Sequence, residues 1–163
     1  MVKIEGLDEI ARRKGKISRV QKITEQGMNG EIPYEVSFRR RWLEIVRPTK
    51  EDLQWLGEFY IQNLTPGVAE VIERLKSQEI NIFILSHVPE LPIRVLAKYL
   101  GLPKENVFAV PAVNDTGGAL NIAPKFLVAI DGFKGVVVKK IRTTGPTVLI
   151  GDGMTDYLAG QYA

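Results

Sequence analysis

Residues Val148 to Asp156 read VLIGDGMTD, and the fold prediction starts from this stretch. An apolar run over residues 147–150 precedes a Gly-Asp-Gly turn, a second Asp and a helical pattern. Such a run, bounded by turn residues, is typical of a strand buried on both faces. We therefore predict a buried strand over residues 147–150, with Asp152 and Asp156 just beyond its carboxyl end.

A second apolar run lies upstream, where Ile80 to Leu85 reads INIFIL and leads into Ser86 and His87. It also predicts a buried strand. Between and around the two runs we expect helices over residues 65–78, 90–100 and 134–142, a strand over 107–110 and a hairpin turn at 114–118. This alternation predicts an α/β domain with a Rossmann-type, doubly wound parallel sheet.

The chain before Asn63 has a different pattern. Apolar residues recur there at intervals of three and four, which predicts about four short helices and no strand. Arg47-Pro48 is expected to end the third helix, and Thr49 with Asp52 three residues later is expected to cap the fourth. We therefore divide the chain into a helical region, residues 1–63, and an α/β core, residues 64–163.

The composition excludes several classes of site. The 163 residues are 45% hydrophobic and 25% charged, as in an ordinary globular domain, and include no Cys. Without Cys there is no disulfide, no Cys-ligated zinc and no thiol nucleophile, and one histidine, His87, disfavours a multi-His metal site or a Ser–His triad. No apolar run is long enough to span a membrane and no signal-peptide pattern opens the chain, so we expect a cytoplasmic protein without a membrane partner.

The net charge of +3 raises the question of nucleic-acid binding. Two basic clusters stand out, at residues 12–16 and 39–41, and acidic residues lie close to both. Surfaces that bind nucleic acids gather their charge on one face and interleave stacking aromatics. We therefore interpret the clusters as solvated helix faces and expect no nucleic-acid partner.

Ligands of open α/β sheets bind beyond the carboxyl ends of the strands, which makes Ser86, Asp152 and Asp156 candidates. A hydroxyl and backbone amides at such a turn can hold phosphate oxygens, and carboxylates at a neighbouring turn can hold Mg²⁺. Lys134, at the start of a helix, could supply a positive charge. A structural alternative stays open, because Ser86 and Asp156 could each cap the helix that follows and Lys134 could lie on the surface.

Taken in order, these motifs resemble the phosphoserine phosphatases of the haloacid dehalogenase superfamily. The resemblance covers nearly the whole chain and implies a haloacid-dehalogenase-type core with a helical cap inserted over residues 1–63. The matching segments are VLIGDGMTD at 148–156, IFILS at 82–86, Lys134 in GFKGVVVKK, EGLDEIA at 5–11, MNGEIPY at 28–34 and LTPG at 64–67.

The resemblance implies contacts to a small phosphorylated substrate, phosphoserine or a close relative. Glu5 would face its amino group and Arg41 its carboxylate, while Met28 and Tyr34 would line the pocket. Solvated or core positions in the helices are the alternative for these four residues. His87, beside the phosphate-binding Ser86, would be a further substrate contact or an ordinary loop residue.

The catalytic roles implied by the resemblance fall on four residues. Ser86 would hydrogen-bond the phosphoryl group and Lys134 would neutralise it. Asp152 would bind Mg²⁺, and Asp156 would orient the metal shell or Lys134. The implied reaction is Mg²⁺-dependent hydrolysis of a phosphomonoester through an aspartyl-phosphate.

Two departures from the family pattern matter. The family's nucleophile lies in a D-x-D-x-T strand, and no such segment occurs in the 163 residues; Asp131 ends an apolar run but has no second Asp at position 133 and no Thr after that. The sequence also ends at Ala163, soon after VLIGDGMTD, where the family pattern leads us to expect a further strand and helix. We therefore expect this chain to be inactive alone and its open sheet edge to favour a homodimer. The alternative function is a non-catalytic fragment or pseudoenzyme that binds a phosphorylated amino acid or a partner chain. The second departure is His87-Val88, where the family usually has Gly-Gly.

Overall fold

The computed structural model describes residues 1–114, 117–122, 132–142 and 145–163. The chain divides into two compact units, Met1–Ala123 and Pro124–Ala163. The expected division at residue 63 stays a prediction. Asp131 and part of the expected hairpin turn lie outside the described residues. Within the described ranges, no helix has the length and apolar character needed to cross a membrane.

The first 63 residues are helical, as predicted, and none of them belongs to a strand, although Val2 and Thr49 make isolated bridges to Leu64 and Ala119. The third helix continues without a break into a π-helical segment and ends at Arg47. This residue lies just before Pro48 and has a left-handed backbone, with a φ of 47°. The elements are α1 (Gly6–Arg13), α2 (Ile17–Met28), α3 (Tyr34–Arg39), the π-helix η1 (Arg40–Val46) and α4 (Lys50–Gln62).

The start of α4 is set by local sequence. The Thr49 hydroxyl accepts a hydrogen bond from the Asp52 N–H at 3.3 Å, and the Asp52 carboxylate accepts one from the Thr49 N–H at 2.8 Å. Both bonds satisfy N–H groups that a helix start leaves without an intrahelical partner. The predicted capping box is therefore confirmed.

The helical core forms where the apolar faces of these helices meet. Its largest fully buried side chains include Ile10, Val20, Phe38, Val46 and Leu56. Helix α4 also packs closely on α6 (Glu90–Tyr99), where Gly57 lies so near Val95 that a Cβ on the glycine would come within 2.6 Å of it. The fourth helix therefore contacts both α1 and an element of the expected core.

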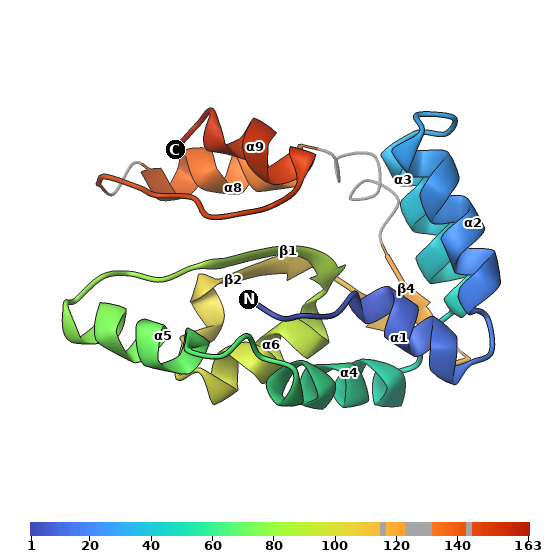
Figure 1. The fold of residues 1–163 in the computed structure, drawn as a ribbon, viewed down its shortest axis with the longest axis horizontal. Helices are drawn as coiled ribbons and strands as arrows, with labels where there is room; N and C mark the ends of the chain where they lie inside the picture. Colours follow the sequence, from blue (N-terminus) through green and yellow to red (C-terminus); the bar gives the residue numbers. More distant parts are fainter. Residues whose placement is uncertain (115–116, 123–131, 143–144) are drawn as a thin grey trace. The chain divides into compact units, whose positions relative to one another are not determined.

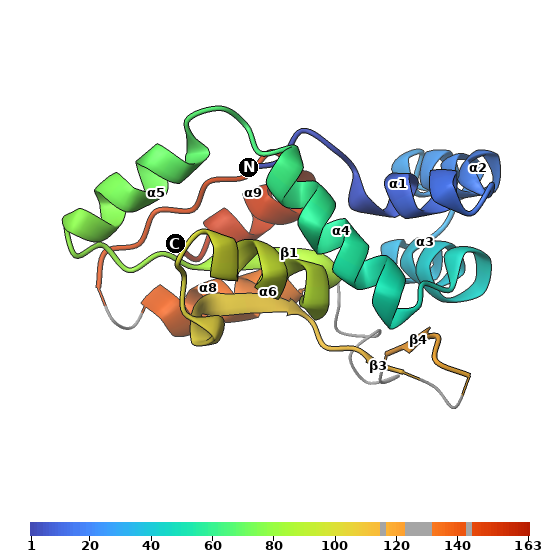
Figure 2. The same ribbon diagram turned by 90° about the horizontal axis from the view of Figure 1, so that it is seen from below.

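A parallel pair of strands lies in the first unit, β1 (Ile84–Pro89) with β2 (Val107–Val110). Helix α6 packs against both strands (Figures 1 and 2). Upstream, α5 (Val68–Ser77) follows Gly67; downstream, Gly101 in the left-handed region ends α6 and the short 3₁₀ helix η2 (Lys104–Asn106) leads into β2. The helices and the second strand are as predicted.

The first strand differs from the prediction. It begins at Ile84 rather than Ile80, and it includes Ser86 and His87, which were expected beyond its end. Of the INIFIL run only Ile84 is buried, and Ile80 is 47% exposed. The strand starts at Ile84 because this residue pairs with Val107, the first residue of β2. An apolar run by itself does not show which other segment will pair with it, so the sequence could not predict this start.

A short antiparallel pair, β3 (Val113–Asn114) with β4 (Leu120–Asn121), confirms the pairing expected for the hairpin. The backbone N–H of Leu120 also donates to the carbonyl of Pro48 at 2.8 Å. This contact holds β4 near the end of η1.

The second unit contains α8 (Phe133–Arg142) and α9 (Met154–Gly160), both as predicted. The buried strand predicted for residues 147–150 is wrong: these residues form no strand, and Val148 and Ile150 are 86% and 91% exposed. A strand needs a hydrogen-bonded neighbour, and none is found for this segment among the described residues. Within residues 1–114, 117–122, 132–142 and 145–163, the parallel strands that pair are β1 and β2.

Candidate functional site

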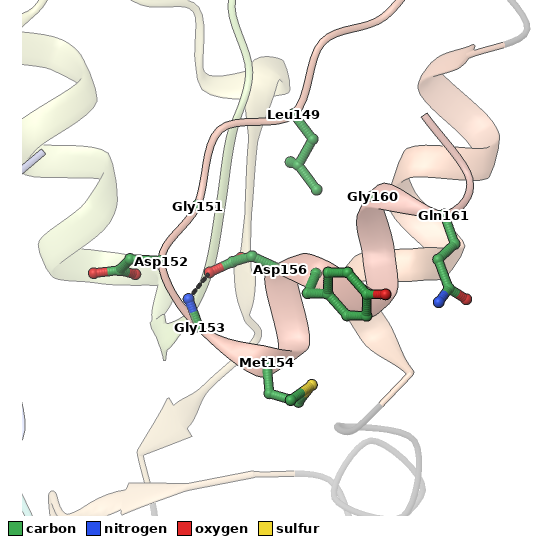
Figure 3. A pocket seen from close by; sticks show the side chains of 9 residues that line it. Leu149, Gly151, Asp152, Gly153, Met154, Asp156, Gly160 and Gln161 are labelled. Atoms are coloured by element: carbon green, nitrogen blue, oxygen red, sulfur yellow. Dashed lines mark hydrogen bonds between the residues drawn. The ribbon is translucent and has the colours of Figure 1, made fainter.

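The loop that enters α9 is organised around the carboxylate of Asp156. One oxygen, Oδ1, lies 2.6 Å from Nζ of Lys134, at the start of α8. The other, Oδ2, accepts a hydrogen bond from the backbone N–H of Gly153 at 3.2 Å (Figure 3). Asp156 therefore caps α9 and pairs with Lys134 at the same time, and its expected catalytic role stays a prediction.

The ionised form of Asp156 is favoured by these contacts. Burial, the largest single influence, would raise the pKa of this carboxyl group, but the hydrogen bond and positive charge of Lys134 together with the N–H groups of Gly153 and Asp152 outweigh it. The net effect lowers the pKa of Asp156 below its ordinary value. Lys134 and Asp156 thus form a charged, mostly buried pair, with side chains 11% and 15% exposed.

Gly151 makes the close approach of Asp156 possible. A Cβ at position 151 would lie 2.3 Å from both Cβ and Cγ of Asp156, a distance that no side chain tolerates. At Gly153 the nearest atom would be Asp156 Oδ2 at 3.5 Å, which is ordinary contact. The first glycine of the Gly-Asp-Gly turn is therefore required for the ion pair, and the second is not required on steric grounds.

Asp152 has a different environment from Asp156. It is exposed, and it lines an open pocket of about 630 Å³ together with Gly151, Gly153 and Asp156. Figure 3 shows its carboxylate directed away from that of Asp156. Among the described residues no three His, Cys, Asp or Glu side chains cluster as metal ligands. Asp152 therefore offers one hard oxygen ligand, which is compatible with Mg²⁺ because this ion often uses one or two carboxylates and completes its shell with water and phosphate.

Ser86 lies in the first unit, in an irregular part of β1, since the register with β2 shifts between Leu85 and Pro89. Its hydroxyl oxygen accepts a hydrogen bond from the N–H of Val88 at 3.1 Å. A hydroxyl has one proton to donate besides its lone pairs, so this bond leaves the O–H proton available for a ligand. The alternative of a helix N-cap is wrong, because α6 begins after Pro89 without a side-chain cap.

Beside Ser86, the His87 ring meets Tyr34 of α3. Tyr34 Oη and His87 Nδ1 are 3.1 Å apart, and the ring centroids are separated by 5.3 Å. The two residues are 53 positions apart in the chain. A side-chain hydrogen bond therefore links the helical region to strand β1 next to Ser86.

Arg41 belongs to the π-helix η1 and is held by its neighbours. Its Nε–H donates to the Ser37 carbonyl at 3.2 Å, and Nη1 donates to the Thr24 hydroxyl at 3.4 Å. Burial lowers the pKa of this guanidinium, while Tyr34, Asp8 and Glu5 act in the opposite direction through their charge. The structure thus brings Glu5 and Arg41, the two expected substrate contacts, into one electrostatic neighbourhood.

Sequence reasoning missed some members of this neighbourhood. Asp8 acts on Arg41 and occupies the fourth position of the EGLDEIA segment, which was the available signal. Thr24 carried no signal in the sequence. Met28 lies at the end of α2 and is 82% exposed, so its pocket role stays a prediction.

The basic clusters have structural contacts. Arg13 stacks over the Trp55 ring, 4.1 Å from its centroid, and Lys14 Nζ lies 2.7 Å from Asp52 Oδ2. Lys16 Nζ donates to the Ile45 carbonyl at 2.7 Å, near the end of η1. These contacts fasten α4 and η1 to the turn after α1.

A family model for haloacid dehalogenase-like hydrolases matches residues 3–163. The chain belongs to this family. The phosphoserine phosphatase of Bos taurus is 29% identical over 163 residues, covering 96% of this chain and 71% of that protein.

Two solved structures agree with this assignment. A phosphoserine phosphohydrolase-like protein from Francisella tularensis is 29% identical, with a TM-score of 0.75 over 96% of this chain and 76% of that one. A phospho-aspartyl intermediate analogue of phosphoserine phosphatase is 25% identical, with a TM-score of 0.73 over 97% and 75% of the two chains. The resemblance inferred from the ordered motifs is confirmed, and so is the α/β fold of haloacid dehalogenase-like hydrolases.

The motif residues of this haloacid dehalogenase-like chain fall into two groups. Glu5, Arg41, Ser86 and His87 belong to the first unit, whereas Lys134, Asp152 and Asp156 belong to the second. Within the second unit, Lys134 and Asp156 are bonded to each other and Asp152 is left exposed.

Proposed function

We propose that this protein is a Mg²⁺-dependent phosphomonoester hydrolase that acts on phosphoserine or a similar small phosphomonoester through an aspartyl-phosphate. The observation that carries the proposal is the loop of residues 151–156. In this loop Asp156 forms an ion pair with Lys134, and Asp152 lies exposed in the neighbouring pocket. Similarity to phosphoserine phosphatases over 96% of the chain supports the choice of substrate class.

In the second unit, Lys134 and Asp152 handle the charge of the phosphoryl group. The Lys134 ammonium has three N–H donors, and its bond to Asp156 leaves others to donate to a phosphoryl oxygen. Asp156 orients this ammonium. Asp152 is the residue that would hold Mg²⁺, which supplies Lewis-acid neutralisation of the phosphoryl charge when bound.

In the first unit, Ser86, Glu5 and Arg41 recognise the substrate. The free proton of the Ser86 hydroxyl donates to a phosphoryl oxygen. In the part of the chain that the structure describes, Arg41 donates through two of its five N–H groups, and the remaining ones suit a carboxylate, which a guanidinium binds bidentately. Glu5 complements a substrate ammonium, so the pair matches a zwitterionic amino acid.

A second candidate function is favoured by one observation. The 163 residues contain no D-x-D-x-T segment, and each motif residue named above is a supporting group rather than a nucleophile. A chain with these groups alone would bind a phosphorylated amino acid without hydrolysing it. Under this alternative the protein is a binding module.

The deciding experiment compares two chains. The 163-residue protein is assayed for Mg²⁺-dependent release of phosphate from phosphoserine beside a form extended with a D-x-D-x-T strand upstream and the family's usual end downstream. We expect turnover from the extended form only, abolished by EDTA. Binding without turnover by the extended form would favour the binding module, and equal turnover by the short form would mean that the nucleophile lies within residues 1–163, with Asp131→Asn as the next variant.

A further inference from the structure

The hydrogen bond between Tyr34 and His87 involves a tyrosine ring that packs against other aromatic rings of the helical region. Tyr34 lies 6.4 Å from Phe38, and Phe38 lies 6.0 Å from Trp42, measured between ring centroids. Residues four apart in a helix stack along one face, and here that face continues through α3 into η1. Phe38 and Trp42 are only 1% and 4% exposed, so the phenol of Tyr34 stands at the end of an aromatic row anchored in the core.

On the other side of this hydrogen bond, the backbone around His87 is held by pairing with β2. Ile84 and Leu85, just before Ser86, pair with β2, and Pro89, just after it, is buried and pairs with Val110. His87 lies between these two fixed points, and its Nε2 atom is buried. The imidazole is therefore held on a stretch of backbone that is fixed at both ends.

The bulk of the two rings lies next to the proposed phosphate-binding hydroxyl. His87 follows Ser86 directly, at a position where the family pattern leads one to expect Gly. A glycine would leave the space between α3 and β1 open, whereas here an imidazole and a phenol occupy it at hydrogen-bond distance. A substrate group that needed this space would have to displace two packed rings and break their bond.

We propose that Tyr34 and His87 together determine substrate specificity by filling the space between α3 and β1 beside Ser86. The site then accepts phosphomonoesters with a compact leaving group, such as phosphoserine, and rejects those with an aromatic leaving group, such as phosphotyrosine. The inference rests on the proposed function, which it deepens by setting the size of the leaving group. It involves residues of the first unit only.

Equilibrium binding tests this inference. Dissociation constants for phosphoserine and phosphotyrosine are measured by calorimetry, in Mg²⁺, on the 163-residue chain. Wild type is expected to prefer phosphoserine, and His87→Gly is expected to reduce the preference by about tenfold or more, a typical effect of altered pocket volume. Tyr34→Ala opens the same space from the other side, so the result does not depend on the folding of one variant.

Two conservative variants separate bulk from hydrogen bonding. Tyr34→Phe keeps the ring and is expected to retain most of the preference, while Tyr99→Phe, at a tyrosine that is 57% exposed, serves as the matched control and should change nothing. Because His87 is the only histidine, its ring nitrogens give a single set of signals in ¹⁵N NMR spectra. Tyr34→Phe should shift those signals and Tyr99→Phe should not.

The outcomes distinguish the two proposals. Three results would each overturn the inference. They are an unchanged preference for phosphoserine in both His87→Gly and Tyr34→Ala, His87 signals that do not shift in Tyr34→Phe, and a wild-type chain that binds neither ester. Failure of the proposed function is detected separately, because the extended chain of the hydrolysis assay would then release phosphate from neither ester.

Discussion

Lys134 Nζ lies 2.6 Å from Asp156 Oδ1, and this ion pair joins the first turn of α8 to the first turn of α9. The second carboxylate oxygen of Asp156 caps α9 through the Gly153 N–H. One side chain thus orients the ammonium, starts a helix and shapes the loop that exposes Asp152.

Asp156→Asn should lower the free energy of opening of α8 and α9 by about 1–3 kcal/mol at neutral pH, because the variant loses charge-assisted bonds. The folded-state pKa of Asp156 is lowered, chiefly by Lys134 acting against the effect of burial. Its stabilisation is therefore present above the unfolded pKa, about 3.9, and disappears as the pH falls through the folded pKa. Amide hydrogen exchange measured from pH 7 to pH 3 should show wild type converging on the variant.

Glu70→Gln is the control for this experiment, because Glu70 is an exposed carboxylate on α5. It should leave the exchange of α8 and α9 unchanged at every pH. A constant difference between wild type and Asp156→Asn across the pH range would contradict the linkage.

Gly151→Ala should disrupt the Lys134–Asp156 pair, because its Cβ would meet Asp156 at 2.3 Å. We expect a loss of about 1–3 kcal/mol, typical of overpacking. Gly153→Ala adds the same methyl group with contacts of 3.5 Å and longer, and its φ of −108° suits any residue. Thermal unfolding of the two variants should therefore differ clearly, and equal midpoints would refute the steric role of Gly151.

Asp152→Asn should remove Mg²⁺-dependent turnover from the extended chain, because a hard anionic ligand is replaced by a neutral amide. Since Asp152 is exposed and outside the Lys134–Asp156 pair, stability should change little. Phosphate release titrated with Mg²⁺, together with a melting curve, measures both effects. A wild-type rate at saturating Mg²⁺ would exclude Asp152 as a metal ligand.

Arg41→Ala should raise KM for phosphoserine in the extended chain much more than KM for a phosphomonoester without a carboxylate. The reason is the loss of a bidentate partner, worth about 1.5–3 kcal/mol for hydrogen bonds to a charged group. Arg41→Lys should restore only part of the loss. Arg40→Ala, at the neighbouring arginine, is the control, and equal KM increases for both substrates would give Arg41 a structural role only.

Local sequence predicted the helices and their ends well. The capping box of Thr49 and Asp52, the stop at Arg47-Pro48 and the start of α9 after the Gly-Asp-Gly turn each depend on a few neighbouring residues, so the sequence predicts them without the fold. The ordered motifs also identified the family, because each motif is a local pattern.

Strands and contacts between distant residues depended on the tertiary structure. INIFIL and residues 147–150 are both apolar runs, yet among the described residues only the end of the first pairs with another strand. Strand pairing depends on two segments, and the sequence of one segment does not show which other segment it will pair with. For the same reason the bond between Tyr34 and His87, 53 residues apart, emerged only from the fold, although both residues were already candidates in the sequence.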